Sequence, residues 1–324
     1  MASTLQVDGA ITFSSTLNGL DILADATNFV DSILISQNAS TGTLDSASSN
    51  TGLGDTVFSA LTSGDFNTAV GFKALEDHTT GASNTAIGAQ ALMNNTTAAN
   101  NVAVGISALK TNTTGASNVA IGKNALDANT TAGNNTAVGA DALGANTTGE
   151  FNIAIGSNAV DANTTANYNI GIGYNALTTE ASGEKNVAIG HAALEDSNGG
   201  NFNTAVGYGS LRNSTTADNN TAFGYHTLVT NTTGASNTAV GFGSLDANTT
   251  GGFNVGLGQS ALTDNTTGAS NVAIGVSALG TNSTADFNTA VGRDSLAANT
   301  TGANNTAVGS LTLDANTTGV ENVA

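Results

Sequence analysis

Residues Asn67 to Ser83 read NTAVGFKALEDHTTGAS, and the pattern begins again at Asn84 as NTAIGAQALMNNTTAAN. It recurs every 17 residues up to Glu321 without insertion or deletion, and a weaker first copy starts at Asn50. The 272 residues from Asn50 to Glu321 therefore hold sixteen repeats, and a seventeenth begins after them. A fixed period of this length is typical of a repeat architecture in which each repeat is one structural unit.

The composition argues against several classes of partner. The chain has 324 residues, of which only 9% are charged, and its formal net charge is −18. Its six basic residues are scattered over different repeat positions, so the basic patch of a nucleic-acid-binding protein is missing. No apolar run approaches the ~20 residues of a membrane-spanning helix. We therefore expect no nucleic-acid partner and no membrane insertion. The absence of cysteine means that the composition does not mark an oxidising compartment.

Residues 1–49 differ from the repeats, and we interpret them as a β-rich N-terminal cap or attachment segment, followed by the array at 50–324. Solenoid ends need such capping because an open terminal turn exposes strand edges. Apolar residues at even spacing predict a short strand there, formed by Leu5, Val7, Ile11 and Phe13. Further apolar clusters follow at Leu20–Leu23 and Ser32–Ile35.

Numbering one repeat from 1 to 17 separates the constant positions from the variable ones. Position 1 is always Asn and position 5 is always Gly. Position 2 is Thr, Val or Ile, position 3 is Ala or Gly, and position 4 is Val, Ile, Leu or Phe. Position 8 is mostly Ala, position 9 is nearly always Leu, and positions 12 to 14 usually read Asn-Thr-Thr. Positions 6, 7, 10, 11, 16 and 17 vary freely.

This pattern predicts an all-β fold, a parallel β-solenoid in which each 17-residue repeat makes one turn. Positions 2 to 4 favour a short strand, the glycine favours a sharp bend, positions 7 to 9 favour a second strand, and positions 10 to 17 favour a return turn. A helix would carry Gly at its centre in every copy and lacks a 3.6-residue apolar stripe. Sixteen turns at the strand spacing of roughly 4.8 Å would extend roughly 75 Å.

Equivalent residues of successive turns are expected to stack into structural ladders. The asparagines at position 1 should bond to one another through their side-chain amides, and the glycines at position 5 should align at the bends. Clear examples are Asn67, Asn84, Asn118 and Asn186 with Gly71, Gly88, Gly122 and Gly190.

The faces of the first strand predict the assembly. Successive side chains point to opposite sides, so positions 2 and 4 place Thr, Val or Ile on one face, and positions 3 and 5 place Ala and Gly on the other. Neither face is charged, and a strand without charge on either face is usually buried on both. A thin roll covers only one face, so we expect sister chains to cover the other in an elongated homotrimeric fibre.

The block N-[TV]-A-[VI]-G-x-x-A-L resembles the head repeat of YadA-like trimeric autotransporter adhesins, and similar repeats occur in phage tail fibres. Good matches begin at Asn118 and Asn186, and the resemblance covers Asn50 to Ala324. It implies a parallel β-roll, three of which wrap around one axis. The family repeat is usually about fourteen residues long, so the Asn-Thr-Thr-Gly segment enlarges the turn here.

The resemblance implies a structural and adhesive fibre. The N-terminal stretch MASTLQVDGAITFSS has neither the basic nor the apolar region of a secretory signal peptide. An autotransporter should have such a signal, a coiled-coil stalk and a C-terminal membrane barrel, and we recognise none of the three in this sequence. We therefore expect a phage tail fibre, located in the virion, attached through its N-terminus and presenting a tip to a host glycan or protein receptor. The alternative is a bacterial cell-surface adhesin or extracellular filament of the same fold.

Two further functions are distant alternatives. The first is an ice-binding solenoid, because rows of Thr could match an ice lattice, although adjacent Thr side chains in a strand would diverge. The second is an enzyme. We expect no enzyme, because no acid–base pair or nucleophile constellation stands out.

Three motif-like features have simpler explanations than a site. The pattern GxGxxA at Gly171 and at Gly256 arises where Gly replaces Ala at position 3, so we expect no cofactor. The histidines fall at different repeat positions, and we interpret them as isolated surface residues that hold no metal: His78, His191 and His226. The Asn-Thr-Thr turns match N-glycosylation sequons, as at Asn95, Asn112 and Asn146, but turn chemistry explains them equally well.

Aromatic residues at positions 6 and 17 are the only candidate contact surface. Exposed rings could stack on receptor sugars, although packing between turns or between chains is the more common use. At position 6 they are Phe72, Tyr174, Tyr208, Tyr225 and Phe242, and at position 17 they are Phe66, Phe151, Tyr168, Phe202, Phe253 and Phe287.

Overall fold

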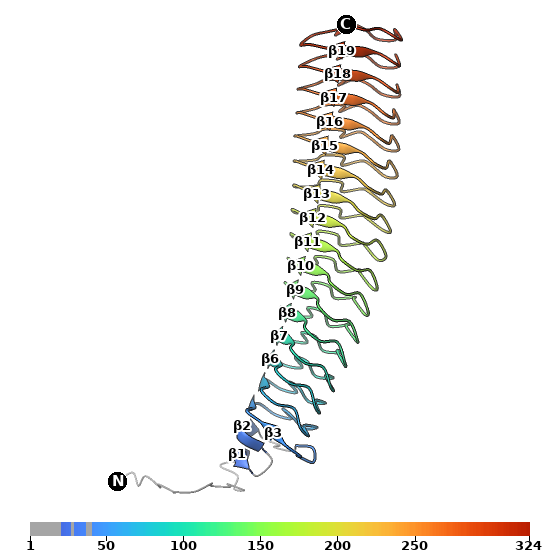
Figure 1. The fold of residues 1–324 in the computed structure, drawn as a ribbon. Coiled ribbons are helices and arrows are strands. Elements are labelled where there is room, and N and C mark those ends of the chain that lie inside the picture. The colour runs from blue at the N-terminus through green and yellow to red at the C-terminus, as the bar shows by residue number, and fades with distance from the viewer. Residues whose placement is uncertain (1–20, 27–28, 37–40) are drawn as a thin grey trace, which may run out of the picture. The chain divides into compact units, whose positions relative to one another are not determined.

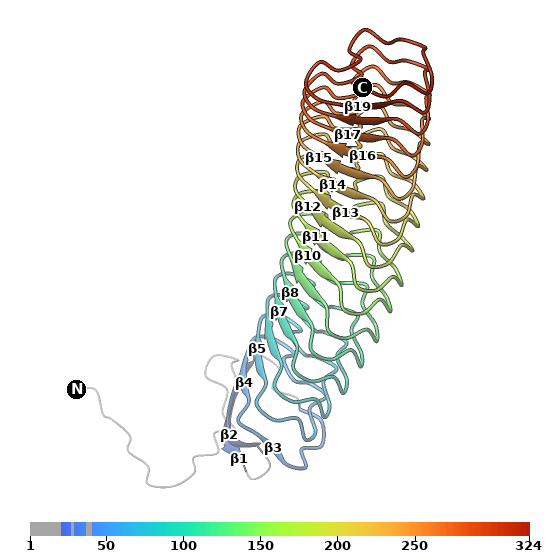
Figure 2. The ribbon, with the colours of Figure 1, turned by 45° about the horizontal axis from the view of Figure 1, so that its top comes forward.

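A computed structural model describes residues 21–26, 29–36 and 41–324 of the chain. These residues form strands, turns and bends but no helix, so the all-β prediction is confirmed. The chain divides into two compact units, Met1–Phe151 and Asn152–Ala324. Each unit is a parallel β-solenoid whose turns stack one on the next (Figures 1 and 2). The predicted strand at Leu5–Phe13 lies outside the described residues.

One three-residue strand occurs in each 17-residue repeat. The first unit contains β1 (Asp21–Ala26), β2 (Phe29–Ser36), β3 (Ala47–Ser48), β4 (Thr51–Leu53), β5 (Thr68–Val70), β6 (Thr85–Ile87), β7 (Val102–Val104), β8 (Val119–Ile121) and β9 (Thr136–Val138). The second contains β10 (Ile153–Ile155), β11 (Ile170–Ile172), β12 (Val187–Ile189), β13 (Thr204–Val206), β14 (Thr221–Phe223), β15 (Thr238–Val240), β16 (Val255–Leu257), β17 (Val272–Ile274), β18 (Thr289–Val291) and β19 (Thr306–Val308).

The repeat strands of each unit pair in parallel without a register slip. Within β7 and β8, Val102 lies beside Val119 and Ala103 beside Ala120. The N-terminal strands join the same sheet of the first unit, because β1 pairs antiparallel with β2 and β2 pairs in parallel with β4. The 17-residue solenoid turn predicted from the sequence is therefore confirmed within each unit.

The prediction of a second strand at repeat positions 7 to 9 is wrong. Those residues form turns, because positions 7 and 9 both adopt left-handed backbone angles, as Gln90 (φ 61°) and Leu92 (φ 49°) show. The turns are nevertheless bonded: Gln90 N–H donates to Phe72 O at 2.8 Å, and Leu92 N–H donates to Ala108 O at 3.0 Å. Inter-turn bonding therefore continues well beyond the strand.

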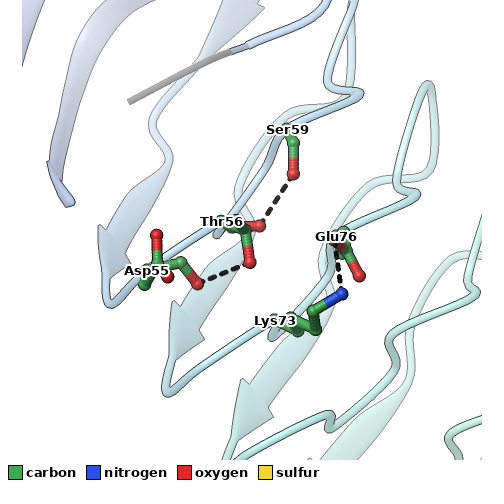
Figure 3. A network of polar contacts seen from close by, with 5 residues as sticks. All are labelled: Asp55, Thr56, Ser59, Lys73 and Glu76. Atoms are coloured by element: carbon green, nitrogen blue, oxygen red, sulfur yellow. Dashed lines mark hydrogen bonds and ion pairs between the residues drawn. The ribbon is translucent and has the colours of Figure 1, made fainter. Parts of the chain in front are cut away.

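Side chains also bond locally along this wall of the solenoid, as the first two turns show (Figure 3). Thr56 Oγ1 donates to Asp55 O and Ser59 Oγ donates to Thr56 O, both at 2.8 Å. In the following turn, Lys73 Nζ and Glu76 Oε1 form an ion pair at 3.1 Å. The two hydroxyl hydrogen bonds satisfy backbone carbonyls in a segment without a regular strand.

Glycine at position 5 is required by both conformation and space. Gly122 has φ 142°, a value that residues with a side chain rarely adopt. A Cβ atom there would collide with the carbonyl oxygen of Gly139 in the next turn. The invariance of this glycine therefore reflects backbone packing between adjacent turns.

The core of each turn is small and partly polar. At position 3, Ala120 is buried, whereas its strand neighbours Val119 and Ile121 point outward. Ala125 and Leu126, at positions 8 and 9, are buried within the same turn. The small face of the strand thus fills the interior, and the larger β-branched face is directed away from it.

Asparagine side chains form two buried ladders. At position 1, Asn84 N–H donates to Asn67 Oδ1 at 2.9 Å, and Asn84 Nδ2 donates to Asn67 Oδ1 at 3.0 Å and across the turn to Ala98 O at 2.9 Å. At position 12, Asn129 Nδ2 donates to Asn112 Oδ1 at 2.8 Å and to Ala132 O at 3.0 Å. The second ladder was missed by the sequence analysis, which placed Asn-Thr-Thr in an ordinary return turn.

Candidate functional site

The outward side chains at repeat positions 2 and 4 form what we call the strand stripe. It consists of Thr, Val, Ile, Leu and Phe only, so it carries no charge in any turn. In a single chain many members at position 4 are open to solvent, from Ile189 at 37% exposure to Val308 at 62%. The stripe runs along each unit and gives it a continuous uncharged face.

Five consecutive turns of the second unit carry aromatic rings at position 6, which we call the aromatic ladder. Its members are Tyr174, His191, Tyr208, Tyr225 and Phe242. Successive ring centroids are 5.3, 4.9, 5.4 and 5.3 Å apart. The last three pairs are nearly parallel, with interplanar angles of 8°, 11° and 3°. The ladder is exposed; Tyr208, for example, is 47% exposed.

Position 7 adds one further aromatic ring beside this ladder, that of His226. His226 stacks on Tyr225 with centroids 4.1 Å apart, and it also lies 5.6 Å from the ring centroid of Tyr208. A side chain at Gly209 would contact the imidazole of His226, because an added Cβ would lie 2.9 Å from the His226 ring. Glycine there leaves room for the histidine.

The stacking limits what the ladder can bind. A sugar ring or planar ligand packs against the face of an aromatic ring, but the faces inside the ladder are already covered by neighbouring rings. The ladder therefore presents mainly ring edges, tyrosine hydroxyls and imidazole nitrogens to solvent. These groups suit hydrogen bonding and packing against another surface better than sugar stacking.

The remaining predicted aromatics are exposed but do not join this ladder. Lys73 Nζ lies 5.6 Å from the ring centroid of Phe72, and Lys185 Nζ lies 5.1 Å from that of Phe202. One intervening turn separates Phe253 from Phe287 at position 17. The others of this exposed set are Phe66, Phe151 and Tyr168.

The interpretation of the histidines as isolated surface residues is wrong. His191 and His226 belong to the aromatic cluster. His78 is buried at position 12, where its Nε2 lies 2.8 Å from Gly81 O and its Nδ1 lies 3.0 Å from Asn95 Nδ2. The carbonyl requires a donor and the amide requires an acceptor, so His78 is the neutral Nε2–H tautomer. Burial lowers the pKa of His78 below its ordinary value of 6.5.

The three asparagines named above as N-glycosylation sequons are inaccessible to solvent in the folded chain. Asn95, Asn112 and Asn146 all belong to the position-12 ladder and are fully buried. Asn112 Nδ2, the atom a glycan would need, donates to Asn95 Oδ1 at 3.1 Å and to Gly115 O at 2.9 Å. Glycosylation of the folded solenoid at these residues is therefore excluded by burial.

A buried carboxylate at position 12 was not predicted. Glu180 accepts hydrogen bonds from the backbone N–H groups of Ser182, Gly183 and Gly199, and from Ser197 Oγ at 2.6 Å. Its turn reads Glu-Ala-Ser where most repeats read Asn-Thr-Thr. That departure was the available signal, but only the fold shows that the residue points inward.

Aspartates at position 10 include two with perturbed acidity. Burial raises the pKa of Asp127, and Asp141 raises it further by like-charge repulsion. Burial also raises the pKa of Asp246, while nearby His226 acts in the opposite direction. Across the described ranges 21–26, 29–36 and 41–324, no three acidic, histidine or cysteine side chains gather as metal ligands would.

The GxGxxA patterns lie in strand-and-turn segments. Gly171 and Gly256 are strand residues whose added Cβ atoms would lie 2.5 Å from Val160 Cγ2 and from Ser244 Oγ, respectively. Neither pattern opens a helix in the described chain, so the helix N-terminus that binds a pyrophosphate is missing.

Comparison with known proteins does not assign a family. No protein-family model matches the sequence, and no curated protein is detectably similar to it. Among the described residues there is also no helix suited to crossing a membrane.

Proposed function

We propose that the chain is the shaft of a structural and adhesive fibre built from three parallel copies. The observation that carries the proposal is the strand stripe, which keeps an uncharged, largely β-branched face outward in every turn. Exposed apolar surface of this continuity marks an interaction site. A second copy has the same turn spacing, so it can cover the stripe along its whole length.

The mechanism of such a shaft is mechanical. Backbone bonds between turns and the two asparagine ladders hold each coil to the next. The N-terminal segment would attach the shaft to a particle or cell, and a distal tip would contact a host glycan or protein. The resemblance of the repeat to those of phage tail fibres and YadA-like adhesins supports a tail fibre in a virion, with a bacterial surface adhesin or filament as the alternative.

The oligomeric state tests the proposal directly. Sedimentation equilibrium of the full chain should give three times the mass of the 31.7 kDa chain, independent of loading concentration over the micromolar range. Replacing Ile121 and Ile155 on the strand stripe with Lys should produce folded monomers, because each ammonium group would be buried without a partner against the neighbouring copy. A monomer at every concentration of the unmodified chain would rule out the trimer.

Electron microscopy of the native source separates the two candidates. Antibody labelling along fibres on virions would support the tail fibre, and labelling on the cell surface would support the adhesin.

A further inference from the structure

A second outward row remains nearly constant along the repeats, and its hydroxyls make no hydrogen bond described within residues 41–324. Repeat position 14 is Thr in thirteen of the sixteen repeats, from Thr80 to Thr318, and it is Ser, Ser and Gly in the others. All thirteen threonines are exposed. We call them the threonine row. Position 17, which is also exposed in most turns, varies freely, so the constancy of position 14 needs a separate cause.

The neighbouring threonines at position 13 show what an internal role looks like. Thr96 Oγ1 donates to Thr113 O at 3.1 Å, and Thr249 Oγ1 donates to Thr266 O at 2.9 Å. Those hydroxyls bond one turn to the next. The hydroxyls of Thr97 and Thr250, one residue later, have no described hydrogen bond to any other group of the chain.

A need for a β-branched shape does not by itself explain the row either. Position 2 also needs an outward β-branched residue, and there Thr interchanges with Val and Ile throughout the array. At position 14, Val and Ile never occur. The hydroxyl group, and not the branched shape, is therefore the property that is kept.

A hydroxyl kept in nearly every turn requires a partner that repeats with the turns. A globular receptor would touch only a few turns, whereas a second copy of the chain presents matching groups at the same spacing. Charge favours the copy as well. The net charge of −18 makes copies repel, but positions 2, 4 and 14 carry no acidic residue in any repeat. These are the rows along which two such chains can approach.

We propose that the threonine row is a lateral contact surface for an adjacent parallel copy, to which its hydroxyls hydrogen-bond. The inference rests on the proposed trimeric shaft and extends it. An interface in a closed threefold ring joins two different surfaces of the same chain. The strand stripe supplies one surface, and the threonine row belongs to the other.

Thiol labelling tests the position of the row, because the chain contains no cysteine of its own. In the assembled full-length protein, a T250C variant should react with a maleimide on the order of tenfold more slowly than a D264C variant, since contact with a neighbouring copy excludes the reagent. Asp264 is exposed at the variable position 11. Both variants should label equally fast after denaturation.

A second variant tests the hydroxyl itself. Replacing Thr233, Thr250 and Thr267 with Val keeps the shape and should raise the dissociation constant of the assembly on the order of a hundredfold, because three hydrogen bonds are lost at each interface. The matched control is T263V at position 10, which should leave the constant unchanged. Circular dichroism should show the same fold in all variants.

The outcomes separate the inference from the proposed function. A trimer in which T250C labels as fast as D264C, and in which the triple Val variant dissociates normally, overturns the inference but leaves the shaft intact. A monomeric chain removes both. Thermal hysteresis of ice growth that disappears in the triple Val variant would assign the row to an ice lattice, which also overturns the contact between copies.

Discussion

The left-handed leucine at position 9 shows how burial outweighs local preference. Leu262 has φ 52°, a conformation that costs roughly 1–2 kcal/mol in an L-residue. Complete burial of a leucine contributes about 1.5–3 kcal/mol. The sequence shows a leucine at this position in nearly every repeat, at the end of the segment for which it predicts a second strand. Because local propensity favours extended backbone at this point, only the packing of the turn reveals the left-handed angle.

The ionisation of His78 should make stability depend on pH. Burial lowers its pKa, so the folded chain binds this proton less readily than the unfolded chain. The resulting stability is complete above the unfolded value of 6.5 and falls as the pH drops below it. Melting temperatures between pH 7.5 and 5 should therefore decline in the unmodified protein.

The variant H78N isolates this effect. Asparagine occupies the same ladder position in most turns and does not titrate, so the variant should melt at a higher temperature than the parent at pH 5 and close to it at pH 7.5. The nearby charges of Lys73, Glu76 and Asp77 are unchanged by the substitution. H191N, at an exposed histidine, is the control and should keep the parental pH dependence. Equal pH profiles for H78N and the parent would contradict the assignment.

Among elements, the two asparagine ladders differ in how far the sequence predicts them. The ladder at position 1 follows from stacked in-register strands, because its asparagine precedes an evident strand. The ladder at position 12 follows an irregular turn, and Asn-Thr-Thr has strong turn chemistry of its own. Its burial depends on the curvature of positions 9 to 15, which no local pattern encodes.

Removal of one rung should be costly. Asn265 Nδ2 donates to Asn248 Oδ1 at 2.8 Å and to Gly268 O at 2.9 Å, and Asn265 Oδ1 accepts from Asn282 at 2.8 Å. N265A leaves these buried partners unsatisfied, at about 1–3 kcal/mol for each group. Urea unfolding followed by circular dichroism should show the loss. D264A, at an exposed position-11 residue whose backbone is not left-handed, should unfold like the parent, and a similar result for N265A would show that the ladder contributes little.

Three of the five rings in the aromatic ladder lie on turns in which the position-12 asparagine is replaced. Glu180, Ser197 and Ser214 replace asparagine in three successive turns. Tyr174, His191 and Tyr208 stack on the outside of the same three turns. We interpret these three rings as an external support for coils whose interior bonding has changed, and Tyr225 and Phe242 continue the stack over two turns that keep the asparagine.

Tyr225 provides the test of that support. Y225A removes ring contacts with Tyr208, His226 and Phe242, each worth about 0.5–1.5 kcal/mol beyond burial. It should lower the melting temperature and reduce the near-ultraviolet circular dichroism. Y225F keeps the ring and should behave like the parent. If Y225A melts at the parental temperature, the stack serves contact with another surface and not stability.

For the whole molecule, the fold class and the length of each turn could be predicted from the sequence, because a strict 17-residue period admits few architectures. Other features could not be predicted, because each depends on which residues of different turns meet. They are the buried ladder at position 12, the inward carboxylate of Glu180, and the stacking of His191 and His226 on tyrosine rings. The 17-residue spacing places the aromatic residues of position 6 on successive turns, but it does not determine that their ring faces stack on one another.

The direction of the inter-turn hydrogen bonds has a consequence for a solenoid placed under tension. Bonds such as Thr85 N–H to Asn101 O join one coil to the next, so a pull along the stack loads them one coil at a time and not all together. Each released coil frees 17 residues, up to roughly 60 Å of slack at the contour length of an extended chain. We expect force spectroscopy on a single chain to record a regular staircase, and one abrupt rupture would contradict it. A single chain of this protein would then yield to tension by lengthening in equal steps, and would dissipate the load gradually.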